Sequence, residues 1–273
     1  VMQERLQFNE DTIWNGGPHE YHHEGAVEYL PRIRQLLQEG KQKEAEDLAM
    51  REFMSVPLRQ KAYQPFGDLH LEFAGHETVS DYKRTLDLDT AVAGVTYRIG
   101  EVTFERTYFS STPDQAIIGH ISADEPEKIS FTARLSSPHD AIRIGLTDND
   151  QIAMTGRVHN GEMTFEARLK IRARGGMVTA SEHGISVTNA DSATLILTGA
   201  SSFVNFKDIS GNPKVRCDKT MQAFNGKSFE VLLERHTGDY QELFGRVRLD
   251  LGRSEAADLP TDQRLKQAAD AHD

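Results

Sequence analysis

The chain of 273 residues contains one cysteine, Cys217, and one tryptophan, Trp14. With a single cysteine no disulfide can form within the chain, so the core alone has to stabilise the fold. At this length roughly three quarters of the unfolded surface can be buried, which is enough for a core without covalent links. Cys217 falls in a predicted helix, where a half-buried structural side chain is expected and a catalytic thiol would require a nearby histidine.

Long apolar runs and excess positive charge are also missing. No apolar stretch approaches the ~20 residues of a membrane-spanning helix. The 42 acidic residues outnumber the 31 lysines and arginines, so the formal net charge is −11. Nucleic acids and anionic membrane surfaces select basic faces. The composition therefore argues against both partners, whereas a neutral sugar is unaffected by this charge.

Several catalytic signatures are absent as well. The sequence has no G-x-S-x-G elbow, no Walker phosphate loop, no dinucleotide glycine fingerprint and no H-E-x-x-H zinc helix. His19, His22 and His23 cluster in a segment bounded by glycine and proline, but a zinc site normally adds a more distant fourth ligand. Asp148-Asn149-Asp150 lacks the glycine and distal glutamate of a calcium loop, so we expect a hairpin turn. No metal and no cofactor is predicted.

Hydrophobic periodicity divides the chain into helical and strand-forming parts. Spacings of three or four residues predict helices near 26–54 and 213–245, and Pro260-Thr261-Asp262 predicts the start of another. Elsewhere the period is two, and Asn160-Gly161 is a strong hairpin signal. The predicted strands are 1–8, 69–73, 92–99, 102–109, 115–121, 128–135, 152–156, 163–171, 177–180, 185–188, 194–198 and 247–251. The sequence therefore predicts a mainly β fold, an antiparallel β-sandwich (a supersandwich) with short helical insertions.

One polar run stands out, Asn9-Glu10-Asp11-Thr12-Ile13-Trp14-Asn15-Gly16-Gly17-Pro18. It ends in two glycines and a proline, which regular helix and strand interiors do not tolerate. Its polar groups would need partners or water if they were buried. We expect a shaped loop that presents Trp14 and the two amides to solvent or a ligand. A competing interpretation is an edge loop in which Trp14 fills a gap in the core.

Further motifs extend this pattern along the chain. They are Tyr63-Gln64-Pro65-Phe66-Gly67-Asp68-Leu69, Tyr82-Lys83-Arg84-Thr85-Leu86-Asp87-Leu88-Asp89-Thr90-Ala91-Val92, Thr107-Tyr108-Phe109-Ser110-Ser111, Ser137-Pro138, Arg235-His236 and Asp239-Tyr240-Gln241-Glu242-Leu243-Phe244. In this order and at these spacings, the chain resembles the amino-terminal domain of family 95 glycoside hydrolases, the α-L-fucosidase family. The resemblance covers essentially the whole chain.

The resemblance implies a domain organisation. Residues 1–252 would form the β-sandwich amino-terminal domain, and residues 253–273 would begin a linker to an (α/α)6 catalytic barrel that is absent from this sequence. In the family the barrel carries the general acid, a glutamate, and the groups that activate water for inversion. Inverting enzymes hold two carboxyl groups about 6.5–9.5 Å apart. No catalytic residue is therefore predicted here, and Arg235, His236 and Asp239 are expected to cap helix ends and contact neighbours.

The resemblance also implies a role. The chain would be the non-catalytic domain of an enzyme that hydrolyses terminal α-L-fucosyl or L-galactosyl linkages, bracing the barrel and shaping its entrance. Its partners would be that barrel and, through the complete enzyme, an oligosaccharide or glycan. Trp14 would face a sugar ring while Asn9, Glu10 and Asn15 reach hydroxyls or barrel residues; the rival is a loop that contacts only the barrel. Three further interpretations stay open: a free-standing carbohydrate-binding module, a subunit-contact module, and the sandwich domain of a sugar phosphorylase.

Overall fold

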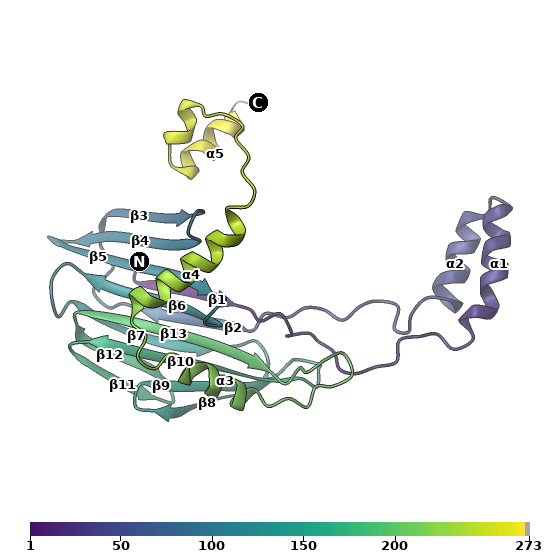
Figure 1. The fold of residues 1–273 in the computed structure, drawn as a ribbon, viewed down its shortest axis with the longest axis horizontal. Helices are drawn as coiled ribbons and strands as arrows, with labels where there is room; N and C mark the ends of the chain where they lie inside the picture. Colours follow the sequence, from purple (N-terminus) through teal and green to yellow (C-terminus); the bar gives the residue numbers. More distant parts are fainter. Residues whose placement is uncertain (271–273) are drawn as a thin grey trace.

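Two antiparallel sheets of unequal width dominate the computed structural model, which describes residues 1–270 (Figure 1). Five strands follow the order β1-β2-β7-β12-β11, and eight follow the order β3-β4-β5-β6-β13-β10-β9-β8. The predicted mainly β sandwich with helical insertions is confirmed.

The strand bounds place most of the chain between residues 67 and 201 in the two sheets. The five-stranded sheet contains β1 (Gln3–Phe8), β2 (Gly67–Glu72), β7 (Ile129–Ser136), β11 (Met177–Ser181) and β12 (Gly184–Ala190). The eight-stranded sheet contains β3 (Ser80–Asp87), β4 (Val92–Ile99), β5 (Val102–Ser111), β6 (Ala116–Ala123), β8 (Asp140–Asp148), β9 (Gln151–Arg157), β10 (Thr164–Arg174) and β13 (Ser192–Ser201).

The main core lies between the sheets and follows the alternation of the strands. Every second residue of β2 and β7 is buried, for example Leu69 and Leu71 opposite Leu135 and Ala133. Burial of each large apolar side chain contributes about 1.5–3 kcal/mol relative to exposure. This is why the period-two segments of the sequence become strands with one face inward.

One charged side chain crosses this core. Arg106 on β5 is 2% exposed, and its guanidinium donates to Glu4 Oε2 on β1 at 2.8 Å and to the hydroxyl of Tyr97 at 2.6 Å. Its Cζ also lies 3.6 Å from the ring centroid of Phe73. A buried charge requires such partners because the desolvation cost is otherwise not offset. The ion pair between Arg106 and Glu4 therefore links β5 of the eight-stranded sheet to β1 of the five-stranded sheet at a defined register.

The outer face of the eight-stranded sheet is covered by two helices. α3 (Pro213–Gln222) contacts β13 and β10, and α4 (Phe229–Phe244) contacts β5. Both begin with a capping side chain, Asn212 for α3 and Ser228 for α4, each accepting a backbone N–H of the first turn. Together the helices and the outward residues of the sheet form a second apolar cluster: Phe109, Ala116, Ile118, Ile196, Met221, Phe224 and Leu232.

Polar contacts hold α4 on the sheet as well. Arg235 donates to Asp114 at 3.1 Å, and His236 Nε2 lies 2.9 Å from the carbonyl oxygen of Thr90. The hydroxyl of Tyr240 donates to the carbonyl of Leu88, so the second half of α4 is anchored over the turn between β3 and β4. Arg235 and His236 thus contact neighbouring segments, as predicted, but the expectation that they cap helix ends was wrong, since both lie within α4.

A helical hairpin stands apart from the sandwich in Figure 1, at the end of two extended segments. It consists of α1 (Ala26–Gln38) and α2 (Gln42–Glu52), joined through Gly40 at φ +74°, a left-handed conformation that favours glycine. Its own cluster of fully buried residues is small: Ile33, Leu36 and Ala45. Such a small core leaves much of the hairpin surface to solvent or to a partner.

One predicted strand is wrong, and two observed strands were missed. Residues 247–251 form an extended tail with no neighbouring strand in residues 1–270, and Val247, Leu249 and Leu251 are 83%, 80% and 86% exposed. Apolar alternation alone cannot supply the second strand that a ladder requires. Conversely, β3 and β8 were not predicted. They are the two edges of the eight-stranded sheet, and every residue of β3 is exposed, so no alternation marks it.

The segment after the tail is helical, as predicted from Pro260-Thr261-Asp262. It contains a short 3-10 helix (Glu255–Asp258) followed by α5 (Thr261–Asp270). Among the described residues no helix is both long enough and apolar enough to cross a membrane.

The second cluster makes α4 an integral part of the sandwich. Leu232→Ala removes a fully buried side chain of α4 and should lower the free energy of unfolding by about 2–5 kcal/mol, because it leaves a cavity against the sheet. Leu243→Ala, on the exposed side of the same helix, is the control and should change it by less than about 0.5 kcal/mol. Urea unfolding followed by circular dichroism measures both. Equal effects of the two substitutions would contradict the packing role of α4.

Candidate functional site

The Asn9–Pro18 segment is half of a two-stranded stalk rather than an isolated loop. The amide of Asn15 donates to the carbonyl of Ala62 at 2.9 Å, and the amide of Gln64 donates to the carbonyl of Ile13 at 2.9 Å. Further out, the amide of Val56 donates to the carbonyl of Tyr21. The segment therefore pairs with residues 62–64 in one isolated bridge, Trp14 with Tyr63, and the two chain segments lead to the α1–α2 hairpin. Neither half alternates in hydrophobicity, so the pairing leaves no periodic signal in the sequence.

Trp14 lies on the surface of the stalk. It is 42% exposed, and its ring centroid lies 5.3 Å from that of Tyr63 at an interplanar angle of 60°. The indole Nε1 donates to the carbonyl of Asp11, and the hydroxyl of Tyr63 donates to the carbonyl of Glu10. The neighbouring Ile13, which is fully buried, fills the core instead. Trp14 and Tyr63 thus expose aromatic surface to solvent, in agreement with the prediction of a loop that presents Trp14.

Glu10 and Asn9 line a cleft of about 200 Å³ at the base of the stalk, opposite Ser111, Thr112 and Gln115. Glu10 Oε2 accepts from the amide of Thr12 at 3.0 Å and from its hydroxyl at 2.6 Å. Burial raises the pKa of Glu10 above its ordinary value. Glu10 is the only carboxylate among the residues lining this cleft, so the cleft lacks the second acid of a glycosidase pair.

Asn15 lines a different cleft, of about 300 Å³, between the stalk and the β9–β10 turn. Its Oδ1 is buried and has no hydrogen-bond partner within the described residues. The two following glycines allow a close fit here. A Cβ on Gly16 would meet Lys61 at 3.0 Å, and one on Gly17 would meet Glu162 at 3.3 Å. A buried oxygen without a donor is costly, and this atom has almost no accessible surface of its own.

The structure therefore does not gather the four predicted site residues into one pocket. Asn9 and Glu10 share a cleft, Asn15 lies in a second cleft, and Trp14 is exposed on the stalk with Tyr63. The sequence marks Tyr63 only as part of a motif, and its position against Trp14 depends on the stalk pairing.

The histidines at the start of the stalk do not form a metal centre. The ring of His19 lies 2.9 Å from the carbonyl oxygen of Val56, and His22 pairs with Glu20 at 2.8 Å. The Glu20 carboxylate raises the pKa of His22. Throughout residues 1–270 no three histidine, cysteine or acidic side chains are grouped closely enough to hold a metal ion.

Cys217 is a structural residue. It is buried on α3, and its Sγ donates to the carbonyl of Glu166 at 3.4 Å. Burial raises the pKa of the thiol to about 12. The thiol stays protonated at neutral pH, so it lacks the thiolate that a nucleophile requires.

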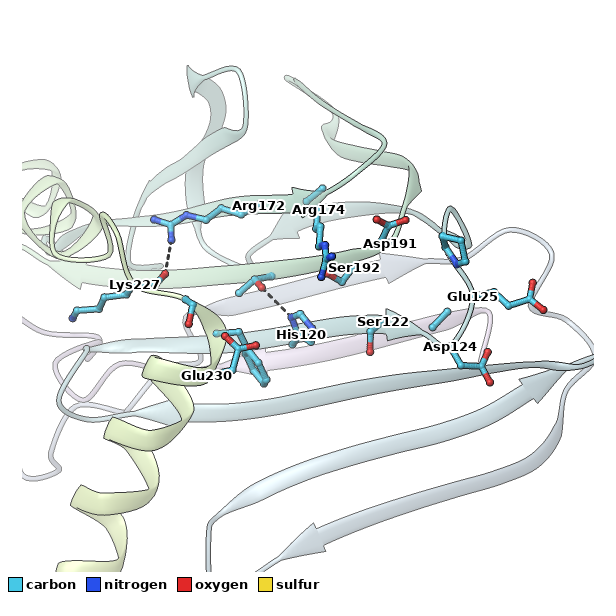
Figure 2. Close-up of a pocket in the computed structure, with 16 residues that line it drawn as sticks. His120, Ser122, Asp124, Glu125, Arg172, Arg174, Asp191, Ser192, Lys227 and Glu230 are labelled. Atoms are coloured by element: carbon cyan, nitrogen blue, oxygen red, sulfur yellow. Dashed lines mark hydrogen bonds between the residues drawn. The ribbon is translucent and has the colours of Figure 1, made fainter.

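A groove of about 650 Å³ on the outer face of the eight-stranded sheet had no sequence signal (Figure 2). It lies between β6, β10, β13 and the start of α4. His120 stacks on the Phe229 ring at 4.2 Å and bonds Thr194 at 2.9 Å, and burial lowers its pKa. Arg172 donates to two backbone carbonyls, those of Phe224 and Lys227.

The acidic side chains at the far end of this groove are also engaged. Figure 2 shows Asp124 and Asp191 at the end opposite Lys227. Asp124 accepts the amide of Thr103, and Asp191 accepts the amide of Glu127. The hydrogen bonds of Asp124 and Asp191 hold strand ends in place, and those of Arg172 hold the start of α4. The groove arises from strands distant in sequence, so no local motif could have predicted it.

Family comparisons divide the chain in two. Residues 1–206 match the model described as glycosyl hydrolase family 65, N-terminal domain, and residues 228–273 match the glycosyl hydrolase family 95 catalytic domain. Because α4 begins at residue 229, the helix that covers the sandwich lies in the second match.

Curated relatives match nearly the whole chain. It is 34% identical to "Alpha-L-fucosidase 2" of Arabidopsis thaliana, over 98% of this chain and 34% of that protein. It is 24% identical to "Probable alpha-fucosidase A" of Aspergillus niger, over 96% of this chain and 35% of that protein. The chain thus spans about a third of the length of these relatives. A solved structure, "Putative kojibiose phosphorylase from human microbiome", aligns with TM-score 0.47 and 12% identity over 66% of this chain and 28% of its own. The resemblance to the amino-terminal domain of family 95 glycoside hydrolases is confirmed.

The environment of Glu10 has a measurable pH signature. Its raised pKa means that the folded chain holds the proton more tightly than the unfolded chain, so this stability is present at low pH and is lost as the pH rises through the folded pKa. Glu10→Gln keeps an acceptor for Thr12 and removes the titration. The unfolding free energy of the original chain minus that of the variant should fall as the pH rises above about 4.5. Urea unfolding across this range measures it, with the exposed Glu28→Gln as control. A difference that stays constant with pH would contradict the burial of Glu10.

Proposed function

Since the chain belongs to the family of glycosyl hydrolase N-terminal domains that the family 65 model describes, we propose that it is the non-catalytic domain of an α-L-fucosidase-like hydrolase. The complete protein would hydrolyse terminal α-L-fucosyl or related L-galactosyl linkages with inversion. In this proposal the sandwich braces the catalytic barrel and shapes its entrance.

The observation that carries the proposal is the extent of the alignment with the Arabidopsis protein. It includes 98% of this chain but only 34% of the relative, so the whole sandwich corresponds to one part of a longer protein named as an α-L-fucosidase. The match of residues 228–273 to a catalytic-domain model supports the same arrangement.

The chemistry of the clefts is consistent with a supporting role. Inversion requires one carboxyl group to protonate the leaving oxygen and another to activate water, about 6.5–9.5 Å apart. Glu10 has no second carboxylate in its cleft and is engaged by Thr12. In the groove on the outer sheet face, Asp124 and Asp191 hold backbone amides, Glu125 pairs with Lys128, and Glu230 is hydrogen-bonded to Ser228. We therefore assign both catalytic carboxylates to the remainder of the complete protein.

The stalk supplies the groups that could shape an entrance. The exposed faces of Trp14 and Tyr63 offer apolar surface of the kind that packs against a sugar ring, and Asn15 lines the cleft beside them. Backbone pairing with residues 62–64 holds these groups on a supported element, which limits the entropy lost when a ligand binds.

The aromatic pair also favours a second candidate, a carbohydrate-binding module that acts without hydrolysis. Its rings meet at 60°, so they form an angled surface rather than a flat platform. Calorimetric titration of the 273-residue chain with fucosylated sugars separates the two roles. Micromolar binding by the chain alone would favour the module, whereas no heat at millimolar sugar would favour the supporting domain.

Release of L-fucose from an α-1,2-fucosylated lactose tests the proposed function. The 273-residue chain should release none, and the complete natural polypeptide should turn the sugar over without added phosphate. The initial product should be the β anomer, since inversion of an α linkage gives β. Turnover by the chain alone would refute a non-catalytic role. If turnover depends strictly on phosphate, the complete protein is a phosphorylase. If neither protein releases L-fucose, the proposed substrate is refuted.

Trp14→Ala in the complete polypeptide tests whether the stalk shapes the entrance. Loss of the indole face should reduce kcat/KM about tenfold, equivalent to about 1.4 kcal/mol, with an unchanged melting temperature because the side chain is half exposed. Phe206→Ala removes an exposed ring elsewhere and serves as the control. A lower melting temperature with normal turnover would show instead that the stalk makes only structural contacts.

A further inference from the structure

A cleft of about 310 Å³ lies on the outer face of the eight-stranded sheet, between the β8 edge and the start of α3 (Figure 1). It is separate from the groove of Figure 2, which lies beside the start of α4. Most of its polar groups come from three neighbouring strands and the start of α3: Arg143, Thr155, Arg157, Thr164, Asn212 and Lys214. We call it the arginine cleft.

Arg143 is turned toward the cleft by the packing of β8. Ile142 and Ile144 pack against the core between the sheets, so the side chain between them points to the outer face. The register of β8 shifts between Asp140 and Arg143, and Ala141 within this bulge has φ +53° and also lines the cleft. A positive φ is uncommon for alanine. Bulges often re-aim a side chain next to a functional site.

Arg157 reaches the same face from the neighbouring strand. Met154 belongs to the core, so Thr155 and Arg157 point to the outer face by alternation. Thr155 lies opposite Arg143 in the register, and Arg157 lies opposite Thr164 of β10. Two guanidinium groups and two hydroxyl groups therefore share this face of the sheet.

The two guanidinium groups have no carboxylate partner within residues 1–270. Asp140, which lies opposite Arg157 in the register, pairs with His159 at 3.1 Å instead. Among the described residues that line the cleft, Glu166 is the one acid, and it pairs with Arg168 at 2.6 Å. A chain with a formal net charge of −11 thus keeps two unpaired arginines in one cleft.

We propose that the arginine cleft binds an oxyanion, either a free ion such as sulfate or the carboxylate of an acidic sugar. The planar guanidinium fork donates two parallel hydrogen bonds to such a group, which makes arginine suited to its recognition. The hydroxyls of Thr155 and Thr164 add donors. The positive end of the α3 macrodipole lies at Asn212 and adds to the attraction.

The size and position of the cleft favour the sugar as the source of the anion. Its volume reaches the lower end of the range for small-molecule sites, about 300 Å³, and exceeds what a bare ion needs. β9 and β10 continue into the turn at Asn160-Gly161, which lines the cleft beside the stalk. The choice of a sugar rests on the proposed function, whereas the binding of an oxyanion does not.

Calorimetric titration of the 273-residue chain at constant ionic strength tests the inference with sodium sulfate, D-galacturonate and D-galactose. The two sugars differ at the carboxylate, so they isolate the effect of the charge. Both anions should bind in the millimolar range or tighter, and galactose should give no heat. Stronger binding of galacturonate than of sulfate would identify an acidic sugar as the source, and equal binding would identify a free ion.

Substitutions locate the binding. Arg143→Gln and Arg157→Gln should each weaken it about tenfold, because each removes charge-assisted hydrogen bonds. Both side chains are exposed, so the melting temperature should not change. Arg34→Gln on the distant α1 is the matched control, since it removes an exposed arginine from beyond the screening distance of about 10 Å.

Three results would overturn the inference: no binding of either anion, equal binding of galactose and galacturonate, or equal weakening by Arg34→Gln. The last would show a general charge effect in place of a site. These titrations do not depend on hydrolysis. Anion binding by a chain whose complete polypeptide releases no fucose would therefore support the cleft while refuting the proposed substrate.

Discussion

The unequal width of the two sheets is the constraint on which the rest of the structure depends. Five strands cannot cover both the inner face and the edges of an eight-stranded sheet, so β3 at one edge remains exposed throughout its length. The wide sheet also presents apolar residues on its outer face, including Phe109, Ile118 and Ile196. Their burial requires a second layer, which α3 and α4 provide, because apolar surface left in water would weaken the fold.

This second layer connects the fold to the proposed function. α4 is required by the sandwich, since Leu232 and His236 are buried against it, yet it lies in the part of the chain that matches a catalytic-domain model. α4 therefore ties the segment that matches the catalytic-domain model to the sandwich. The stalk and the α1–α2 hairpin extend from another part of the sandwich, and the stalk is held by backbone hydrogen bonds and by the contact between Trp14 and Tyr63. In the proposed supporting role, both features would face the rest of the complete protein.

Prediction from the sequence succeeded where burial on one face imposes a period. The central strands, the four helices from α1 to α4 and the Asn160-Gly161 hairpin follow from alternation, helical spacing and turn chemistry. It failed at β3, an edge strand in which every residue is exposed, and it missed β8, although Ile142, Ile144 and Leu146 alternate there and the two isoleucines pack against the core. It failed again at residues 247–251, whose alternation has the period of a strand but finds no partner within residues 1–270. Periodicity reports which side chains favour burial, and it does not report whether a neighbour is present.

The sequence by itself determined the β-sandwich class, the positions of the helical insertions and the family, because all three depend on local pattern and motif order. Only the tertiary structure decided how the polar run at residues 9–18 is used. Its pairing with residues 62–64 joins segments separated by two helices and places Trp14 against Tyr63, while Glu10 and Asn15 line separate clefts. Contacts of this kind depend on chain geometry over long sequence separations, which hydrophobic period and residue type do not encode.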